Sequence, residues 1–573
     1  MLGRQLLVLG CSDRKRGVSD LLPAIDRYDG PYYRVLRNYL REHDWPRNLS
    51  VAVLSAEYGL VGGLTRIKDY NKRMTRSLAL GKAEDCCKTL SAWACNHDSV
   101  ILSLGNDYMP ALEKVTEGAL RSKTSVFEGG IGEKQSQVKS LLHASGASER
   151  RVAVHPKAGS GKVSYFLPDW DDLLDANFDF RTDRFSGASR TERNDKHCSI
   201  LMKPERMCDG ILVSLAQHLS GKGPLRRFVG SDESSLAPID LRSRFGLADD
   251  QSLFGDCGAF SYANEEEPTI SIEQAVALYD LHGFDFGASV DHIPVPYVTT
   301  ESGKRLLTEA ERSERVQLTK DNAAAFITTA KRRKAGFLPV GTIQALTPEG
   351  FISNVRLYHE MGYRHLAIGG LVPLADTAVE AIVTAVMSEA SQLSPRPWVH
   401  LFGVFRPKLQ AKFRELKVDS FDSATYFRKA WLRSDQNYLA PDGSWYAAIR
   451  VPMTSDPRTL KRLQEDGADV RLLQAQEAEV MRLLCRYDRD EADLEETLNA
   501  VLSYDAQLTR SSDSRSLKEK YQATLQKRPW RDCRCPFCRE QGIHVLIFRG
   551  CNRNKRRGAH NTLMLYGSLG QQI

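Results

Sequence analysis

GILVSLA (210–216) begins a series of seven apolar runs, and each run ends in a polar or glycine-rich turn. The other six are SLFGDCGAF (252–260), FDFGASVDHIP (284–294), FLPVGTIQA (337–345), HLAIGGLVP (365–373), WVHLFGVF (398–405) and DSFDSAT (419–425). Segments with helical periodicity lie between several of them, at Glu273–His282, Pro348–Met361, Ala375–Ser391 and Pro407–Leu416. Seven buried strands that alternate with amphipathic helices predict a (β/α)8 barrel, a TIM barrel, over residues 208–456.

The predicted barrel places its functional residues at the ends of these runs, because barrel active sites form at the carboxyl ends of the strands. The polar and glycine residues found there are Asp256, Asp291, Gln344, Gly369, Gly370 and Asp422. A carboxylate accepts hydrogen bonds from paired N–H groups, while an amide and free backbone N–H groups suit a carbonyl. Together these groups suit the edge of a guanine-like heterocycle. Two further carboxylates beside a glycosidic bond would suit displacement at a sugar carbon.

A set of metal ligands stands near the C-terminus, within residues 528–573. CRCPFC supplies Cys533, Cys535 and Cys538, and GAHN supplies His560 after 21 intervening residues. Three thiolates and one imidazole form a complete tetrahedral set for Zn²⁺. A complete set leaves no open coordination position for water, so the sequence predicts a structural zinc site in a separate subdomain.

The segments outside the barrel and the zinc site differ in pattern. Residues 1–150 predict a smaller parallel α/β domain, because strand-like runs alternate there with helical stretches. These runs are Leu6–Gly10, Val51–Gly63 and Ser99–Gly105. Residues 151–207 are rich in Gly, Ser and Asp and are expected to form a linker that leads into the barrel. Residues 457–527 carry charged amphipathic stretches and predict a helical insertion.

Positive charge is concentrated around the zinc ligands. The formal net charge of the whole chain is +7, but residues 513–573 contain 13 lysines and arginines against 4 acidic residues. The densest run comprises Arg553, Lys555, Arg556 and Arg557. A localised basic face predicts contact with a nucleic-acid backbone, although a solvated basic tail is an alternative interpretation.

Composition limits where the protein works. The chain has no apolar run of about 18 residues, which argues against a membrane span, and its N-terminus does not resemble a signal peptide. The 12 cysteines are scattered and show no disulfide framework. We therefore expect the protein to reside in the reducing cytoplasm, without a membrane partner.

Residues 208–570 resemble the tRNA-guanine transglycosylase family, whose members are zinc-containing TIM barrels. DCGAF is similar to the family's DSGGFQ segment, IGGL to its AIGGL segment and FDS to its FDC segment, and CRCPFC…GAHN resembles its CxCxxC…EHN zinc signature. The four matches occur in the family's order. The N-terminal segments CSDRKRG, LPAIDRYDGPYYRVLR and VLSAEYGL look like the small domain of the DpdA-type branch, which places 7-deazaguanine bases in DNA.

The resemblance implies roles for the residues at the strand ends. Asp422 would be the nucleophile that attacks the anomeric carbon of a nucleotide, and Asp256 would be the acid and base for the departing and arriving bases. Asp291, Gln344 and the Gly369–Gly370 backbone would bind the base. The four residues of the metal signature would hold structural Zn²⁺.

The activity implied by the resemblance is replacement of guanine in DNA by 7-cyano-7-deazaguanine, with accessory proteins or a homodimer as further partners. Some segments depart from the family pattern: Ser261 replaces a glutamine, Ala259 replaces a glycine, and ATYFRKAW (424–431) replaces an arginine-rich segment. Two alternatives stay open. One is an enzyme that acts on tRNA, and the other is a non-catalytic nucleic-acid-binding subunit of such an enzyme.

Overall fold

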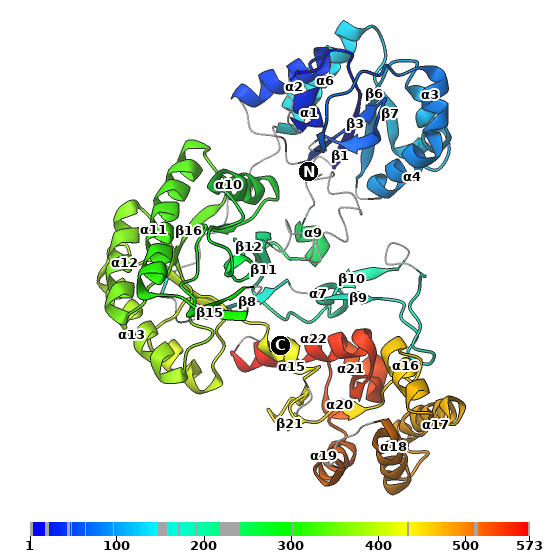
Figure 1. The fold of residues 1–573 in the computed structure, drawn as a ribbon, viewed down its shortest axis with the longest axis vertical. Coiled ribbons are helices and arrows are strands. Elements are labelled where there is room, and N and C mark those ends of the chain that lie inside the picture. The colour runs from blue at the N-terminus through cyan, green and yellow to red at the C-terminus, as the bar shows by residue number, and fades with distance from the viewer. Residues whose placement is uncertain are drawn as a thin grey trace.

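The computed structural model covers the 573-residue chain and shows a barrel at its centre, with an α/β domain on one side and a helical C-terminal region on the other (Figure 1). The structure describes residues 4–17, 22–42, 46, 48–63, 65–95, 97–146, 158–159, 161, 163–169, 172–188, 193–216, 241–300, 303–432, 435–508 and 514–570. Among these residues, no helix combines the length and apolar character that a membrane crossing requires.

The barrel is closed by eight parallel strands. In barrel order they are β11 (Gly210–Ser214), β12 (Ser252–Asp256), β13 (Phe286–Ala288), β16 (Leu338–Ile343), β17 (His365–Ile368), β18 (Trp398–Leu401), β19 (Ser420–Asp422) and β8 (Ser164–Pro168). The predicted (β/α)8 barrel is therefore confirmed, and seven of its strands coincide with the seven apolar runs.

The eighth strand, β8, corrects the expected domain boundary at residue 208. It pairs with β19 and β11 and so closes the barrel from within the segment expected to be a linker. Its connection to β11 contains β9 (Leu173–Asp175), β10 (Asp195–His197) and the single-turn helix α7 (Cys198–Leu201) instead of a long helix. Because no strand–helix alternation is present at this point, the sequence pattern does not predict this strand.

Two apolar layers hold the barrel together. Its interior is filled by Phe166, Leu212, Phe254, Phe286, Ala288, Val340, Ala367 and Trp398. The outer layer packs the strands against α10 (Ile272–Leu281), α11 (Glu309–Arg332), α12 (Pro348–Met361), α13 (Asp376–Gln392) and α14 (Gln410–Glu415). Reciprocal capping boxes at Ser271 and Thr308 fix where α10 and α11 begin.

The N-terminal domain is a five-stranded sheet in the order β4 (Gly59–Gly62), β3 (Leu49–Ser55), β1 (Gln5–Gly10), β6 (Ser99–Ser103) and β7 (Thr124–Val126). Helices α2 (Pro31–Glu42) and α6 (Ile131–Gly146) pack on one face, and α4 (Ala83–Ala94) packs on the other. The expected sheet was wholly parallel, but β4 is antiparallel to β3. Gly59, at φ +71°, lies at the turn that folds the run 51–63 into a hairpin.

The C-terminal region is helical, as predicted for residues 457–527. Its helices are α16 (Pro457–Glu465), α17 (Val470–Asp488), α18 (Leu494–Leu508), α19 (Ser514–Lys527), α20 (Pro529–Asp532), α21 (Pro536–Gln541) and α22 (Gly550–Ser568). They share one continuous apolar core with the barrel. Helix α22 packs closely against α15 (Thr425–Lys429), where a side chain at Gly558 would meet the Phe427 carbonyl oxygen at 2.7 Å.

Candidate functional site

The alternation of side chains along the barrel strands brings the predicted site residues together. Phe254 fills the barrel interior, so Asp256, two residues later at the end of β12, points the same way. Val340 also fills the interior, so Gln344, four residues later, points inward as well. Asp422 is the last residue of β19, and Asp291 follows β13 directly beside this end of the barrel. All of these side chains therefore gather at the carboxyl end, where barrel enzymes bind their substrates.

The Asp422 carboxylate is buried and held through one oxygen. Its Oδ1 lies 3.1 Å from His400 Nε2 and accepts a hydrogen bond from the Gly403 N–H at 2.8 Å. Burial lowers the pKa of His400, so its ring is neutral, with the proton on Nε2 facing the carboxylate. His400 Nδ1 then accepts from the Ser420 hydroxyl at 2.7 Å. No hydrogen-bond partner of Asp422 Oδ2 is found among the described residues.

Asp256 has an unusual proton affinity. Burial raises its pKa to about 7, and the nearby negative charges of Asp291 and Asp422 add to this effect. Hydrogen bonds from the backbone N–H groups of Gly258 and its neighbour act in the opposite direction. A carboxyl group with this pKa can both give and take a proton near neutral pH. Gly258 has φ +86°, a backbone conformation that favours glycine. A side chain at this position would also meet Ser214 Oγ at 2.3 Å.

Asp291 and Gln344 form a hydrogen-bonded pair. Gln344 Nε2 donates to Asp291 Oδ2 at 2.7 Å, and the Cys257 thiol donates to Asp291 Oδ1 at 2.9 Å. Tyr262 donates its hydroxyl to the Asp291 carbonyl oxygen at 2.9 Å and so fixes this turn. Burial raises the pKa of Asp291. Gln344 Oε1 is buried and has no partner among the described residues, which marks it as an acceptor for a ligand.

The two glycines after β17 leave room for the Gln344 amide. A side chain at Gly369 would meet Gln344 Nε2 at 2.1 Å, and one at Gly370 would meet Gln344 Oε1 at 2.8 Å. Gly370 also has φ +73°. The glycine pair is thus needed for the backbone to pass directly beside the carboxamide.

Sequence reasoning missed His400, Cys257 and Tyr262. One signal was visible for His400, because it stands at an inward position of the otherwise apolar run WVHLF, two residues after Trp398. No comparable signal existed for Cys257 or Tyr262, whose roles depend on the turn that follows β12.

The raised pKa of Asp256 predicts how the protein's stability depends on pH. Between about pH 4, the unfolded pKa, and pH 7, the folded state keeps a proton that the unfolded chain has lost. Stability therefore falls as the pH rises through this window, and Asp256→Asn removes that loss. From pH 5 to pH 8 we expect the variant to gain about 3 kcal/mol relative to the unchanged protein.

This gain is measured as the difference between the melting temperatures of variant and unchanged protein at several pH values. Asp435→Asn, at an exposed carboxylate, serves as the control and should show no pH-dependent difference. A difference for Asp256→Asn that is the same at pH 5 and pH 8 would contradict the assignment.

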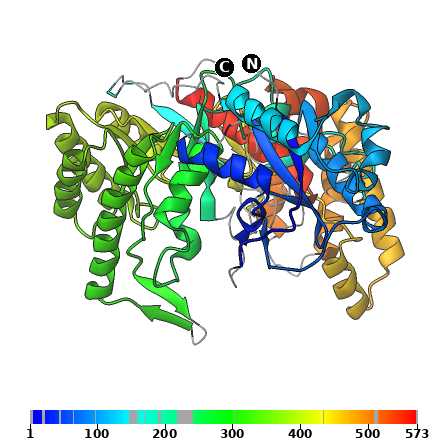
Figure 2. The ribbon, with the colours of Figure 1, turned by 90° about the horizontal axis from the view of Figure 1, so that it is seen from above.

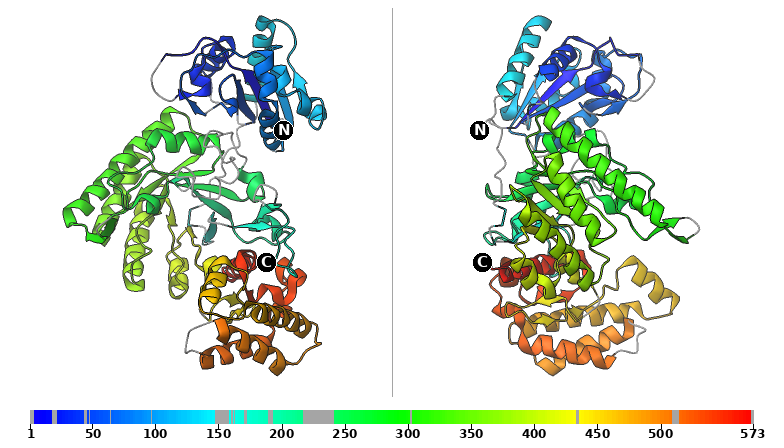
Figure 3. Two further views of the ribbon diagram at one scale, coloured as in Figure 1. Left: turned by 45° about the vertical axis from the view of Figure 1, so that its right-hand side comes forward. Right: turned by 90° about the vertical axis from the view of Figure 1, so that its left-hand side faces the viewer.

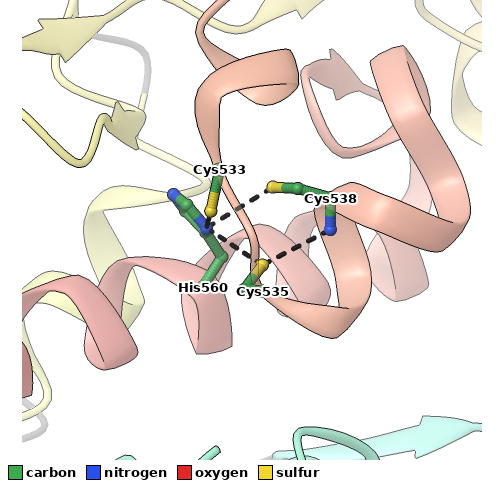
Figure 4. Close-up of side chains that lie close together, drawn as sticks. All are labelled: Cys533, Cys535, Cys538 and His560. Atoms are coloured by element: carbon green, nitrogen blue, oxygen red, sulfur yellow. Dashed lines mark hydrogen bonds between the residues drawn. The ribbon is translucent and has the colours of Figure 1, made fainter. Parts of the chain in front are cut away.

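The predicted metal ligands converge in a buried cluster (Figure 4). Its members are Cys533, Cys535, Cys538 and His560, whose ligand atoms all lie within 4.8 Å of one another. The three sulfur atoms stand 3.4–3.5 Å from His560 Nδ1. His560 Nε2 donates to the Leu439 carbonyl oxygen at 2.7 Å, which fixes the tautomer that leaves Nδ1 free to coordinate. The cluster therefore fits a bound metal ion.

The basic run near these ligands does not form a phosphate-binding face, so that prediction is wrong. Its arginines, Arg553, Arg556 and Arg557, are buried in α22. Arg553 pairs with Asp183 at 2.9 Å. Arg557 donates to the carbonyl oxygens of Ala430 and Val545 at 3.1 and 2.8 Å. The arginines of the run therefore serve the packing of α22, because they bind acidic groups and carbonyl oxygens of the segments around it.

The gathered carboxyl groups at the catalytic end of an eight-stranded barrel define a TIM-barrel enzyme. No family model matches the chain. A DNA-guanine transglycosylase of Salmonella montevideo is 32% identical over 416 residues, which span 71% of this chain and 97% of that relative. The chain therefore belongs to the guanine transglycosylase family.

Other relatives match over shorter stretches. A tRNA-guanine(15) transglycosylase of Pyrococcus abyssi is 27% identical over 195 residues, which span 33% of this chain and 30% of that protein. The protein of the same description from Pyrococcus furiosus is 36% identical over 90 residues, 16% of this chain and 15% of that protein. Less than a third of each of these two relatives is therefore covered.

Proposed function

We propose that this enzyme exchanges guanine in DNA for a 7-deazaguanine base, namely 7-cyano-7-deazaguanine, through a covalent aspartyl–nucleotide intermediate. The observation that carries the proposal is the Asp422 carboxylate, which is buried at the barrel mouth near Asp256. Its Oδ1 accepts two hydrogen bonds, whereas Oδ2 has no partner among the residues that the structure describes. The choice of DNA is supported by the relative named as a DNA-guanine transglycosylase, which this chain matches over 97% of its length.

Base binding replaces hydrogen bonds that the site now makes internally. The adjacent N–H donors of guanine, on N1 and the exocyclic amine, suit the two Asp291 oxygens that currently accept from Cys257 and Gln344. Gln344 Nε2, released from Asp291, and the backbone N–H of Gly370 then donate to the guanine carbonyl. Adenine lacks these donors and would leave a buried carboxylate unpaired, so it is rejected.

The exchange proceeds in two displacements. Asp422 attacks C1′ of the deoxyribose, the C1′–N9 bond breaks, and the Asp256 proton goes to the departing guanine. The new base then enters, gives its N9 proton to Asp256 and attacks C1′, and the bond to Asp422 breaks. The protein is regenerated unchanged, and no nucleotide energy source is consumed because one glycosidic bond replaces another.

The C-terminal cluster holds Zn²⁺ in this proposal. Three thiolates and one imidazole are the donors that zinc prefers, and four protein ligands leave no position for a reacting water. The metal would cross-link α20–α22 rather than supply chemistry, because a filled coordination shell offers no position to a substrate.

The proposed function is tested by incubating the protein with radiolabelled 7-cyano-7-deazaguanine and either duplex DNA or tRNA. We expect label in DNA and none in tRNA, since the matches to the tRNA-named proteins of Pyrococcus abyssi and Pyrococcus furiosus cover only 30% and 15% of those proteins. Label in tRNA alone would replace the DNA assignment with the tRNA alternative. Binding of either nucleic acid without incorporation would favour the non-catalytic subunit instead.

A further inference from the structure

A two-stranded hairpin projects from the barrel next to the candidate site. It consists of β14 (Tyr297–Thr300) and β15 (Gly303–Leu306), which connect β13 to α11. Figure 2 and the right-hand view of Figure 3 show that it stands away from the barrel helices. A hairpin without a third strand is only marginally stable in water, so a conspicuous one at an active site calls for a role.

The outward face of this hairpin is apolar and cationic. Tyr297 and Leu306 are directly opposite each other across the strands, and their exposed fractions are 44% and 76%. Among the large apolar side chains that the structure describes, none is more exposed than Leu306. Lys304 lies on the same face with its ammonium group 4.5 Å from the centre of the Tyr297 ring. Val298, on the opposite face, is buried and anchors the hairpin.

The base of the hairpin is fixed to the candidate site. The strand begins six residues after Asp291, and the connecting segment is clamped by Arg315, which donates to the Ile293 carbonyl oxygen at 3.1 Å. The Thr299 N–H donates to Asn264 Oδ1 at 2.9 Å, in the loop that follows Asp256. The hairpin is therefore held rigidly by the two loops that follow the Asp256 and Asp291 strands.

A second exposed apolar residue lies in the same neighbourhood. Phe260 is 61% exposed and belongs to the short 3₁₀ helix Ala259–Tyr262. It stands four residues before Asn264, the residue that accepts the hydrogen bond from the Thr299 N–H. Exposed apolar groups gathered beside an active site mark a surface that contacts a partner. The mixture of aromatic, aliphatic and cationic groups suits a nucleic acid, whose bases stack on rings and whose phosphates attract ammonium groups.

We propose that the β14–β15 hairpin is a DNA-contacting arm that occupies the space left in the duplex when the target guanine turns out into the barrel. This inference rests on the proposed function, because a base inside a duplex cannot reach Asp422 without leaving the stack. Leu306 is the wedge between the bases that flank the vacated position, Tyr297 supports it by stacking, and Lys304 binds a neighbouring phosphate. A two-stranded ribbon is narrow enough to enter the major groove.

The test compares two duplexes that differ only opposite the target guanine. In one the guanine is paired with cytosine, and in the other it faces an abasic site, so that extrusion requires little help. For Leu306→Ala we expect kcat/KM of base exchange to fall about 10-fold on the paired duplex and less than 2-fold on the abasic one. Leu80→Ala, at a similarly exposed leucine of the N-terminal domain, is the control and should leave both rates unchanged.

The outcomes separate the arm from the exchange reaction. An equal fall on both duplexes, or no fall on either, would overturn the arm while leaving the exchange reaction in place. If the unchanged protein exchanges no base on either duplex, the proposed function itself fails, and the arm fails with it. Because Leu306 is exposed, its replacement should not alter the melting temperature, which is measured alongside.

Discussion

Replacement of Asp422 by asparagine is expected to abolish base exchange, lowering its rate by about 10⁴-fold or more. An asparagine oxygen can accept the same hydrogen bonds from His400 and the Gly403 N–H, so the fold should persist. The amide is nevertheless a poor nucleophile and cannot form the ester to C1′. The measurement is incorporation of labelled base, together with a denaturing gel that separates protein bound covalently to DNA from free protein.

The unchanged protein, mixed with DNA and no incoming base, should give a shifted covalent band that Asp422→Asn lacks. Asp435→Asn, which alters an exposed carboxylate outside the barrel mouth, is the matched control and should keep both the band and the rate. Exchange by Asp422→Asn at the normal rate would remove Asp422 from the reaction and, with it, the proposed mechanism.

Replacement of Cys538 by serine is expected to release the metal and to unfold the segment from α20 to α22. Apparent binding free energies of structural zinc are about 10–16 kcal/mol, so this loss exceeds the effect of any ordinary substitution. Three further ligands would remain buried without their ion. We expect the melting temperature to fall by about 10 °C or more and the metal content to fall from one ion per chain to nearly none.

Cys551→Ser provides a matched control, because Cys551 lies on the same helix, α22, but is exposed and outside the cluster. This variant should retain one metal ion per chain and an unchanged melting temperature, measured by atomic emission and calorimetry. A Cys538→Ser protein that keeps a full equivalent of metal, or that loses it without any fall in melting temperature, would show that the cluster does not stabilise the fold.

Much of the barrel and its site could be predicted because both depend on short-range patterns. Buried strands leave continuous apolar runs, and the polar residue after each run falls at the same end of a parallel barrel. The positions of Asp256 and Asp422 at the carboxyl ends of β12 and β19 could be predicted for this reason. The strand Ser164–Pro168 was not, because it lies in a Gly- and Ser-rich segment without a following helix, and only its pairing with β19 and β11 identifies it.

Long-range contacts explain the other differences. The sequence shows that Arg553 and Arg557 are cationic but does not show their partners. Asp183 pairs with Arg553, and the Ala430 carbonyl oxygen accepts a hydrogen bond from Arg557. Both partners are more than a hundred residues away along the chain. The hydrogen bond from His400 to Asp422 likewise joins neighbouring barrel strands. Such partners depend on which segments meet in three dimensions, and no local spacing encodes them.

The contact between α15 and α22 connects the metal cluster to Asp422, the proposed nucleophile, through few residues. Asn561, the neighbour of the ligand His560, donates to the Tyr426 carbonyl oxygen at 3.3 Å, and Tyr426 lies only four residues after Asp422. If Asp422 reacts as proposed, we expect molecules without the metal ion to hold the end of β19 less accurately and to be less active. Specific activity should then scale with the metal-to-protein ratio, which makes that ratio a practical assay of how much of a preparation is competent.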